Sequence, residues 1–168
     1  CLAWLAQAQG AAESNGARKK RKKESQGQTL AGLGMVLLGT SSGRIVAWDL
    51  TTGNIEYDIT AYERKEVSHI STSADGRYFY SVSKGTKAMK RFDVKTGKSD
   101  SEIDVGSKGA LIVSTDRTGS RVATGNSSLH LWDQSSKQTI GVFPGHASNI
   151  TTLTFSPDST YLLSTAYN

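Results

Sequence analysis

Cysteine and proline are scarce in this chain, whose 168 residues include 1 cysteine and 2 prolines. A single cysteine excludes an internal disulfide and a zinc site built from several cysteines. Two prolines are too few for a proline-rich linker. The longest apolar run, Leu30–Gly39, is about half as long as a membrane-spanning helix and is interrupted by glycines. We therefore expect neither a disulfide framework nor a membrane partner.

Excess positive charge is confined to one short segment. The formal net charge is +5, and the run RKKRKK at Arg18–Lys23 holds six cations. Without this run, the remaining lysines and arginines nearly balance the 15 acidic residues. The basic pI of 9.4 therefore reflects one segment and does not predict a basic globular surface.

One pattern recurs three times: an alternating apolar strand that ends in an aromatic-Asp pair and is followed by a turn. The pairs are Trp48-Asp49, Phe92-Asp93 and Trp132-Asp133, which lie 44 and 40 residues apart. A second marker is an aspartate in the turn before a middle strand, at Asp75, Asp116 and Asp158, spaced by 41 and 42. Both markers indicate an internal repeat of about 42 residues.

Each repeat has room for four short strands joined by tight turns. The expected strands are Val67–Thr72, Tyr78–Ser83, Lys87–Asp93 and Ser99–Val105 in the second unit, and Ala110–Ser114, Arg121–Thr124, Ser128–Trp132 and Gln138–Phe143 in the third. Gly53 and Gly97 stand where a hairpin turn needs a positive φ. Each unit is thus expected to be an antiparallel four-stranded meander, as in a propeller blade.

The pattern Gly145-His146, then SPDS, then a Trp-Asp that closes a third strand resembles the WD repeats. This resemblance implies an all-β, WD-repeat β-propeller fragment of about three four-stranded blades plus part of a fourth, not closed. The expected blades are 1–60, 61–106, 107–145 and the partial 146–168. Since the chain stops after the second strand of a blade, we expect a central slice of a longer protein.

WD repeats often join His, Ser/Thr, Asp and Trp side chains in one hydrogen-bonded set per blade. Here a Gly-His pair occurs once, and the positions where the set would hold an aspartate are Ser42, Thr86 and Asn126. Phe92 also lacks the indole donor. We therefore expect packing and backbone pairing to hold these blades, with His146 serving the polar set of the last one.

The tryptophans are expected to fill the space between adjacent sheets. Large aromatic rings bury more apolar area than any other side chains, which suits them to the wedge between two blades. This interpretation applies to Trp4, Trp48 and Trp132.

A basic insertion at about 6–33 separates the first two strands of the first blade, CLAW and Met35–Ser41. Its Ala, Gly, Gln, Ser, Lys and Arg content predicts a disordered loop. Three interpretations are open for its cations: a solvated charge run, a nuclear localisation signal, or contact with nucleic-acid phosphates. The last two are compatible. The residues concerned are Arg18, Lys19, Lys20, Arg21, Lys22 and Lys23.

The sequence offers little for catalysis. His69, His130 and His146 lack metal-ligand spacing, and no Gly-x-Ser-x-Gly nucleophile motif is present. The repeated aspartates stand at turns, where they have structural roles. We therefore predict no enzyme activity, cofactor, metal site or small-molecule substrate.

A closer resemblance concerns function. The CLAW opening, the polybasic insertion, the GTSSGRI strand pair and the closing FPGHASNITTLTFSPD resemble the N-terminal propeller of the WD repeat-containing protein 43 family. That family belongs to the nucleolar small-subunit processome. The resemblance implies a non-catalytic scaffold of the nucleus and nucleolus, which supports pre-rRNA transcription and processing, with processome proteins and pre-rRNA as partners.

Two other classes stay open. One is a general WD-repeat adaptor, such as a ubiquitin-ligase substrate receptor or a coat subunit, in which the basic run is incidental. The other is a propeller enzyme of the quinoprotein or lactonase kind, which the Trp-Asp pairs and the Gly-His disfavour.

Overall fold

The computed structural model describes residues 1–5 and 34–167. The insertion expected at 6–33 lies outside the described residues. The described chain forms strands and turns and contains no helix.

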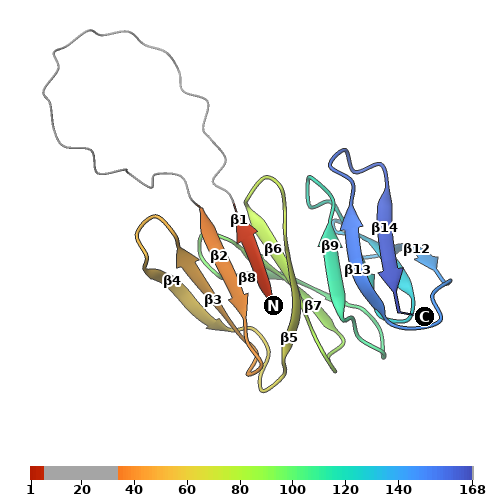
Figure 1. Cartoon of the computed structure of the whole chain (residues 1–168), viewed down its shortest axis with the longest axis horizontal. Coiled ribbons are helices and arrows are strands. Elements are labelled where there is room, and N and C mark those ends of the chain that lie inside the picture. Colours follow the sequence, from red (N-terminus) through yellow and green to blue (C-terminus); the bar gives the residue numbers. More distant parts are fainter. Residues whose placement is uncertain (6–33, 168) are drawn as a thin grey trace, which may run out of the picture.

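The strands form three four-stranded antiparallel sheets and one two-stranded sheet, each a meander in chain order (Figure 1). The first sheet holds β1 (Leu2–Leu5), β2 (Met35–Gly39), β3 (Arg44–Asp49) and β4 (Ile55–Thr60). The second holds β5 (Val67–Thr72), β6 (Tyr78–Ser83), β7 (Ala88–Asp93) and β8 (Ser99–Asp104). The third holds β9 (Ile112–Thr115), β10 (Arg121–Gly125), β11 (Leu129–Asp133) and β12 (Thr139–Phe143). The last holds β13 (Ile150–Phe155) and β14 (Leu162–Ala166).

This architecture confirms the expected fold class: three propeller blades and part of a fourth, with no closed sheet in the described chain. Strands β5 and β6 coincide with the expected ranges, and the others differ only at their ends. The agreement follows from the period-two alternation of apolar residues, which fixes which face of each strand is buried.

The turns between the first two strands of the second, third and fourth blades show that the aspartates Asp75, Asp116 and Asp158 are not all equivalent. The amide of Ser73 donates to the carbonyl of Tyr78, that of Asp116 to Arg121, and that of Ser156 to Tyr161. Asp116 is therefore equivalent to the two serines and not to Asp75 and Asp158. The turn has the sequence Ser-x-Asp in the second and fourth blades and Asp-x-Thr in the third. The carboxyl and the hydroxyl have therefore exchanged places in the third blade.

Three apolar cores lie between successive sheets. The first joins Leu37, Ile45 and Ala47 of the first sheet to Val67, Ile70, Phe79 and Phe92 of the second. The second core joins the second and third sheets through Tyr80, Val82, Met89, Val113, Val122 and Trp132. The third core joins Ile112, Ala123 and Leu129 to Ile150 and Leu153. Each sheet is thus stabilised by its neighbours and not by a common central core.

The first strands of successive sheets, β1, β5, β9 and β13, lie next to one another (Figure 1). Two of the second strands, β2 and β10, end in a glycine that lies against the next sheet. A Cβ on Gly39 would stand 2.7 Å from Val67 Cγ1, and one on Gly125 would stand 3.1 Å from Ile150 Cδ1. Glycine at these positions therefore allows the sheets to converge toward their first strands.

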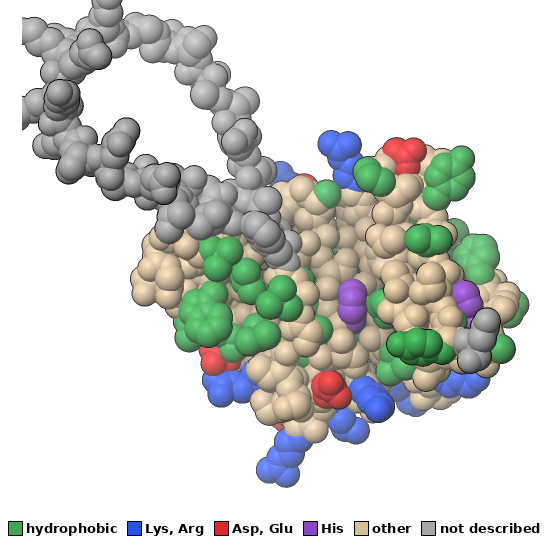
Figure 2. Space-filling view, in the orientation of Figure 1, with side chains coloured by type: hydrophobic (Ala, Val, Ile, Leu, Met, Phe, Trp, Pro, Cys, Tyr) green, Lys and Arg blue, Asp and Glu red, His purple; other side chains and the backbone are tan. Residues whose placement is uncertain are grey.

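The expectation for the tryptophans holds at Trp132, which is 7% exposed within the second core. It is wrong for Trp48, which is 40% exposed. Trp48 lies on the face of the first sheet that points away from the second, and no other described sheet covers that face. The side chain of Trp4 lies outside the described part. Figure 2 shows hydrophobic side chains gathered over the first sheet and again over the opposite end of the array.

The turn between the third and fourth strands needs a left-handed residue in every four-stranded blade. Gly53 and Gly97 supply it with φ values of 74° and 66°, and Lys137 supplies it in the third blade with φ 57°. A side chain in this conformation contacts its own backbone, a cost that glycine avoids.

Replacing Lys137 with glycine should therefore stabilise the chain, by about 0.5–1 kcal/mol once the greater freedom of unfolded glycine is counted. Urea unfolding of the 168-residue chain would measure the change. The matched control is Gly97→Ala, which should destabilise because its Cβ would stand 2.8 Å from the Tyr57 ring. An unchanged or lowered midpoint for Lys137→Gly would contradict this account of the turn.

Candidate functional site

The aspartates of the three aromatic-Asp pairs organise the turns that follow the third strands. Asp49 Oδ1 accepts the Thr51 amide at 2.7 Å, Asp93 Oδ1 accepts the Thr96 amide at 2.8 Å, and Asp133 Oδ1 accepts the Ser136 amide at 2.7 Å. Such Asx turns fix the chain reversal locally. The hydroxyl of Ser135 and the amide of Ser136 lower the pKa of Asp133 to about 2. The carboxylate of Asp133 is therefore an ionised acceptor within its turn.

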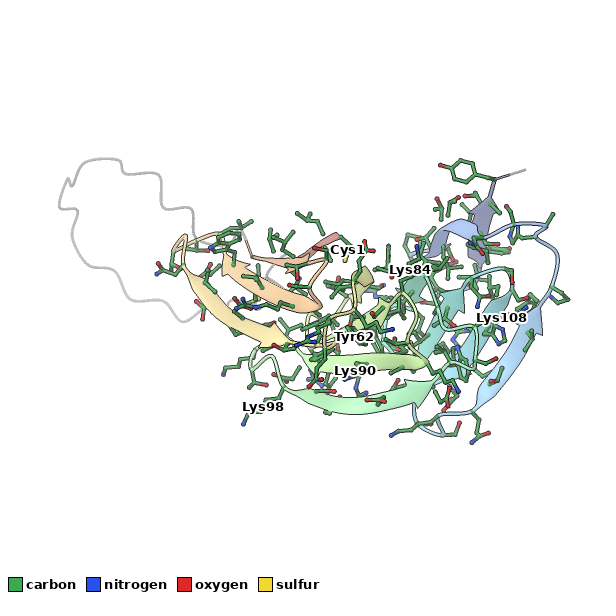
Figure 3. All side chains as sticks on the ribbon, turned by 90° about the horizontal axis from the view of Figure 1, so that it is seen from below. Cys1, Tyr62, Lys84, Lys90, Lys98 and Lys108 are labelled. Atoms are coloured by element: carbon green, nitrogen blue, oxygen red, sulfur yellow. The ribbon has the colours of Figure 1, made fainter. Side chains whose placement is uncertain are left out.

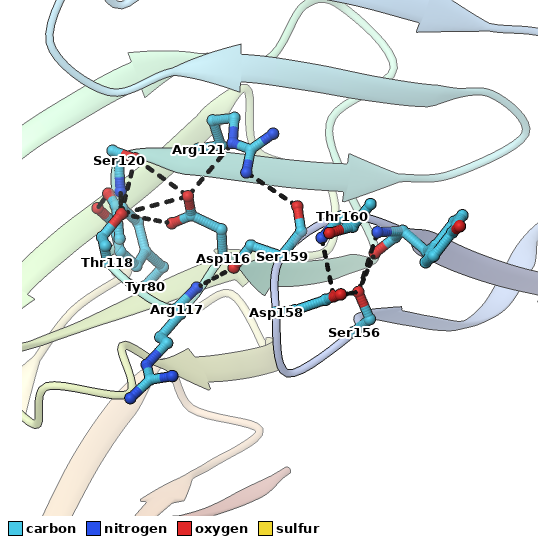
Figure 4. Close-up of polar contacts among 12 residues, drawn as sticks. Tyr80, Asp116, Arg117, Thr118, Ser120, Arg121, Ser156, Asp158, Ser159 and Thr160 are labelled. Atoms are coloured by element: carbon cyan, nitrogen blue, oxygen red, sulfur yellow. Dashed lines mark hydrogen bonds and ion pairs between the residues drawn. The ribbon is translucent and has the colours of Figure 1, made fainter.

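Asp116 forms the densest polar cluster of the described chain, and Figure 4 shows it. Its carboxylate is 3% exposed and accepts hydrogen bonds from Thr118, Ser120 and Arg121. Burial alone would raise the pKa of Asp116, but the hydrogen bonds from Arg121 and Ser120 lower it overall. The buried charge is thus compensated by donors, as a buried carboxylate requires.

The same cluster links the third and fourth blades (Figure 4). The amide of Arg117 donates to Ser159 Oγ at 2.9 Å, and the Arg121 guanidinium donates to the Ser159 carbonyl at 2.9 Å. Ser159 has a φ of 60°, an unusual conformation for serine. The two bonds from the neighbouring blade hold it there. The cluster therefore has a structural role, because its hydrogen bonds join the third blade to the fourth.

Packing and backbone pairing were expected to hold these blades in place of the full WD polar set, but the second and third blades also keep part of that set. In the last blade His146 makes the contact expected of it. The second strands carry hydroxyls at one equivalent position, Ser81, Thr124 and Ser164. The indole of Trp132 donates to Thr124 Oγ1 at 2.8 Å, and His146 Nε2 lies 2.8 Å from Ser164 Oγ. In the second blade the hydroxyl of Tyr62 donates to the Ser81 carbonyl at 2.7 Å. The second, third and fourth blades thus each keep part of the set, built from different residues.

The side chain of Phe92 has no hydrogen-bond donor, and in the second blade the Tyr62 hydroxyl donates instead. The rings of Phe79 and Phe92 stack with centroids 4.9 Å apart, so this aromatic pair contributes packing only. Lys90 Nζ lies 5.2 Å from the centre of the Tyr62 ring and donates to the Ala61 carbonyl at 3.0 Å. Figure 3 shows Tyr62 and Lys90 beside each other. Burial raises the pKa of Tyr62 well above its usual value, so its hydroxyl remains a donor.

The three histidines lie apart. His146 belongs to the polar set, His130 stacks on Trp132 with centroids 5.9 Å apart, and burial lowers the pKa of His69 so that its imidazole is neutral. Among the described residues, no group of three His, Cys, Asp or Glu side chains could hold a metal ion. A search of the described residues for a long apolar helix that could cross a membrane also found none.

The six cations of Arg18–Lys23 lie outside the described residues. The strands on either side of their segment are described, and they pair directly, with Leu5 opposite Met35. Met35 also pairs with Asp49, so the segment is attached at the end of the sheet where the third-strand turns lie.

The lowered carboxyl pKa values give the stability of the chain a definite pH dependence. For Asp49, Asp116, Asp133 and Asp158 the folded pKa lies below the ordinary value of 3.8. The unfolded chain therefore binds protons first as the pH falls. The stabilisation is complete above pH 3.8 and is lost from there toward about 2.

Urea unfolding at several pH values would measure this loss, and Asp133→Asn should make the unfolding free energy less dependent on pH in that window. A free energy of unfolding that stays constant from about pH 5 to about pH 2 would contradict the assignment.

Replacing Thr124 with valine keeps the side-chain shape but leaves the Trp132 indole N–H without its acceptor. The free energy of unfolding should fall by about 1–3 kcal/mol, because a buried donor then loses its hydrogen bond. In a Trp132→Phe background, which has no N–H, the same substitution should cost much less. Equal costs in the two backgrounds, measured by urea unfolding, would show that the bond is not the cause.

Comparison with known proteins agrees with this structure at its C-terminal end. Residues 137–168 match the WD domain, G-beta repeat family. The matched range includes β12, β13, β14 and His146, which is the hydrogen-bonded histidine of the last blade. No curated protein matches the chain. The WD-repeat match at 137–168 agrees with the blade-like sheets of the described chain.

Proposed function

We propose that this chain is a scaffold in nucleolar assembly of the small ribosomal subunit, where it supports pre-rRNA transcription and processing. WD repeats mediate protein–protein contacts, which supports a scaffold role in general. The observation that carries the finer proposal is the polybasic run Arg18–Lys23, attached to blades whose own charges nearly cancel. The proposed partners are processome proteins and pre-rRNA, and the proposed location is the nucleolus.

The attachment of the basic segment supports contact with a polyanion. Because Leu5 and Met35 pair directly, both ends of the segment start from one point at the rim of the first sheet. Six adjacent cations on such a tether reach phosphates without base readout, and such binding weakens steeply with salt. The same run fits recognition by a nuclear import receptor.

The test is replacement of all six cations by alanine in the tagged protein, expressed in its native cells. Nuclear import, recovery of crosslinked pre-rRNA, or both should fall, because either role needs the clustered charge. Crosslinked RNA is sequenced to ask whether the pre-rRNA 5′ region is enriched. A control removes charge elsewhere, at the exposed Lys84, Lys95, Lys98 and Lys108.

Unchanged import and unchanged pre-rRNA recovery in the alanine variant would contradict the proposal. That outcome would favour the general WD-repeat adaptor. The near balance of charges outside the basic run and the WD-repeat match support that alternative.

A further inference from the structure

Different residues fill the two junctions between the four-stranded sheets, beside the turns that follow the third strands. Between the first and second sheets, Tyr57 of β4 lies across the junction, and its hydroxyl donates to the Val94 carbonyl at 2.9 Å. Its ring packs so closely on Gly97 that a Cβ there would stand 2.8 Å from it. Val94 itself is 9% exposed. This junction is therefore closed by an aromatic ring, a valine and a glycine.

The register identifies the equivalent residues in the next junction. Tyr57 pairs with Ala47, which precedes Trp48, and Ser101 pairs with Arg91, which precedes Phe92. Ser101 thus takes the place of the tyrosine. In the turn after the third strand, Gln134 follows Asp133 as Val94 follows Asp93, and Lys137 takes the place of Gly97.

These three replacements leave an open cleft between the second and third sheets. Its volume is about 440 Å³, and its lining includes Arg91, Asp100, Ser101, Ser120, Gln134 and Lys137. A volume of this order accommodates a small ligand or one or two side chains of a peptide. Arg91 is held in one wall, because it donates to both Asp100 carboxylate oxygens, at 2.7 and 2.8 Å, and lies 4.4 Å from the Tyr78 ring centre.

Gln134 provides independent evidence for a ligand. It is only 8% exposed, and its Nε2 donates to Ser101 Oγ at 3.0 Å. Its Oε1 is buried and accepts no hydrogen bond from any described residue. Whichever way the amide is turned, one of its polar atoms bonds Ser101 and the other lacks a partner. A buried amide left half satisfied is costly, and a ligand that donates to it removes that cost.

The charges around the cleft indicate the sign of the ligand. At this end of the sheets the repeat aspartates are occupied by the N–H groups of their own turns. Asp100 is paired with Arg91. The exposed cations at this end include Lys95, Lys98, Arg117 and Lys137, whereas Arg77 is paired with Asp75 at 3.9 Å. An incoming segment therefore meets positive charge at the rim and an unsatisfied amide acceptor inside.

We propose that the cleft between the second and third sheets binds an extended acidic peptide segment of a partner protein. A carboxylate of the segment pairs with Lys137, and a peptide N–H donates to Gln134 Oε1. The proposal rests on the scaffold role above and names one docking site for it. Backbone N–H groups recur along any extended peptide, so the specificity comes from the carboxylate and the shape of the cleft.

The test begins with a random 12-residue peptide library selected on the 168-residue chain in which Arg18–Lys23 are all alanine. Those substitutions prevent acidic peptides from being captured by the basic run. Enriched peptides should carry Asp or Glu, and their affinity is then measured by fluorescence anisotropy. A 12-residue uridine RNA is measured in parallel as the competing polyanion.

Two variants address the cleft. The variant Ser101→Tyr, Gln134→Val, Lys137→Gly closes it with the residues of the first junction, and Lys137→Glu reverses one exposed charge without filling it. Each should weaken peptide binding by about tenfold or more, because a central contact is lost. Lys84→Ala removes an exposed lysine at the opposite end of the second sheet and should leave binding unchanged. Circular dichroism establishes that each variant is folded.

Three outcomes would overturn the proposal: no enrichment of acidic peptides, equal binding to both cleft variants and the parent chain, or cleft-dependent binding of the uridine RNA alone. Assay of the closed variant for pre-rRNA recovery in cells separates the two proposals. Lost peptide binding with retained pre-rRNA recovery supports both the cleft and a separate RNA contact. If the six-alanine variant keeps both nuclear import and pre-rRNA recovery, the proposed function is contradicted, but the peptide-binding result for the cleft is unaffected.

Discussion

Apolar burial between successive sheets is the constraint on which the rest of this structure depends. Each strand is short, and a single antiparallel sheet of such strands would leave apolar side chains exposed to water. Such a sheet is therefore not stable alone. The second sheet solves this by burying Phe79 and Phe92 against the first sheet and Val82 and Met89 against the third. A fully buried side chain of this kind contributes about 1.5–3 kcal/mol. Backbone hydrogen bonds within each sheet fix the register of its strands.

The polar contacts follow from that burial. The hydroxyls of Ser81 and Thr124 are enclosed when the sheets meet, and they are paired with the Tyr62 hydroxyl and the Trp132 indole. The turns at the sheet ends use carboxylates for the same reason, because their amides have no strand partners. Among the described residues four buried side-chain atoms lack a partner, namely Ser68 Oγ, His69 Nδ1, Ser83 Oγ and Gln134 Oε1. Of these four residues, Gln134 is the one that lines the cleft.

The fold was predictable from the sequence because alternation and turn residues repeat at a near-constant interval. The strand pair β5–β6 was correctly bounded, since the Ala-Asp-Gly turn between them leaves little choice. The equivalence of Asp116 to Ser73 was missed, because carboxyl and hydroxyl exchange places while bonding the same backbone groups. The exposure of Trp48 depends on which sheet covers its face, and the role of Tyr62 depends on a contact across blades. The cleft depends on the register that sets Ser101 opposite Arg91, which no local pattern encodes.

Hydrogen exchange of the 168-residue chain, followed by mass spectrometry, tests the central claim that stability resides in the junctions between sheets. Amides in β6, β7, β9 and β10, whose sheets are covered on both faces, should exchange slowest. Those in β3, β4, β13 and β14, whose sheets are covered on one face in the described chain, should exchange markedly faster. Uniform protection across all sheets, or greatest protection in the first sheet, would contradict the account.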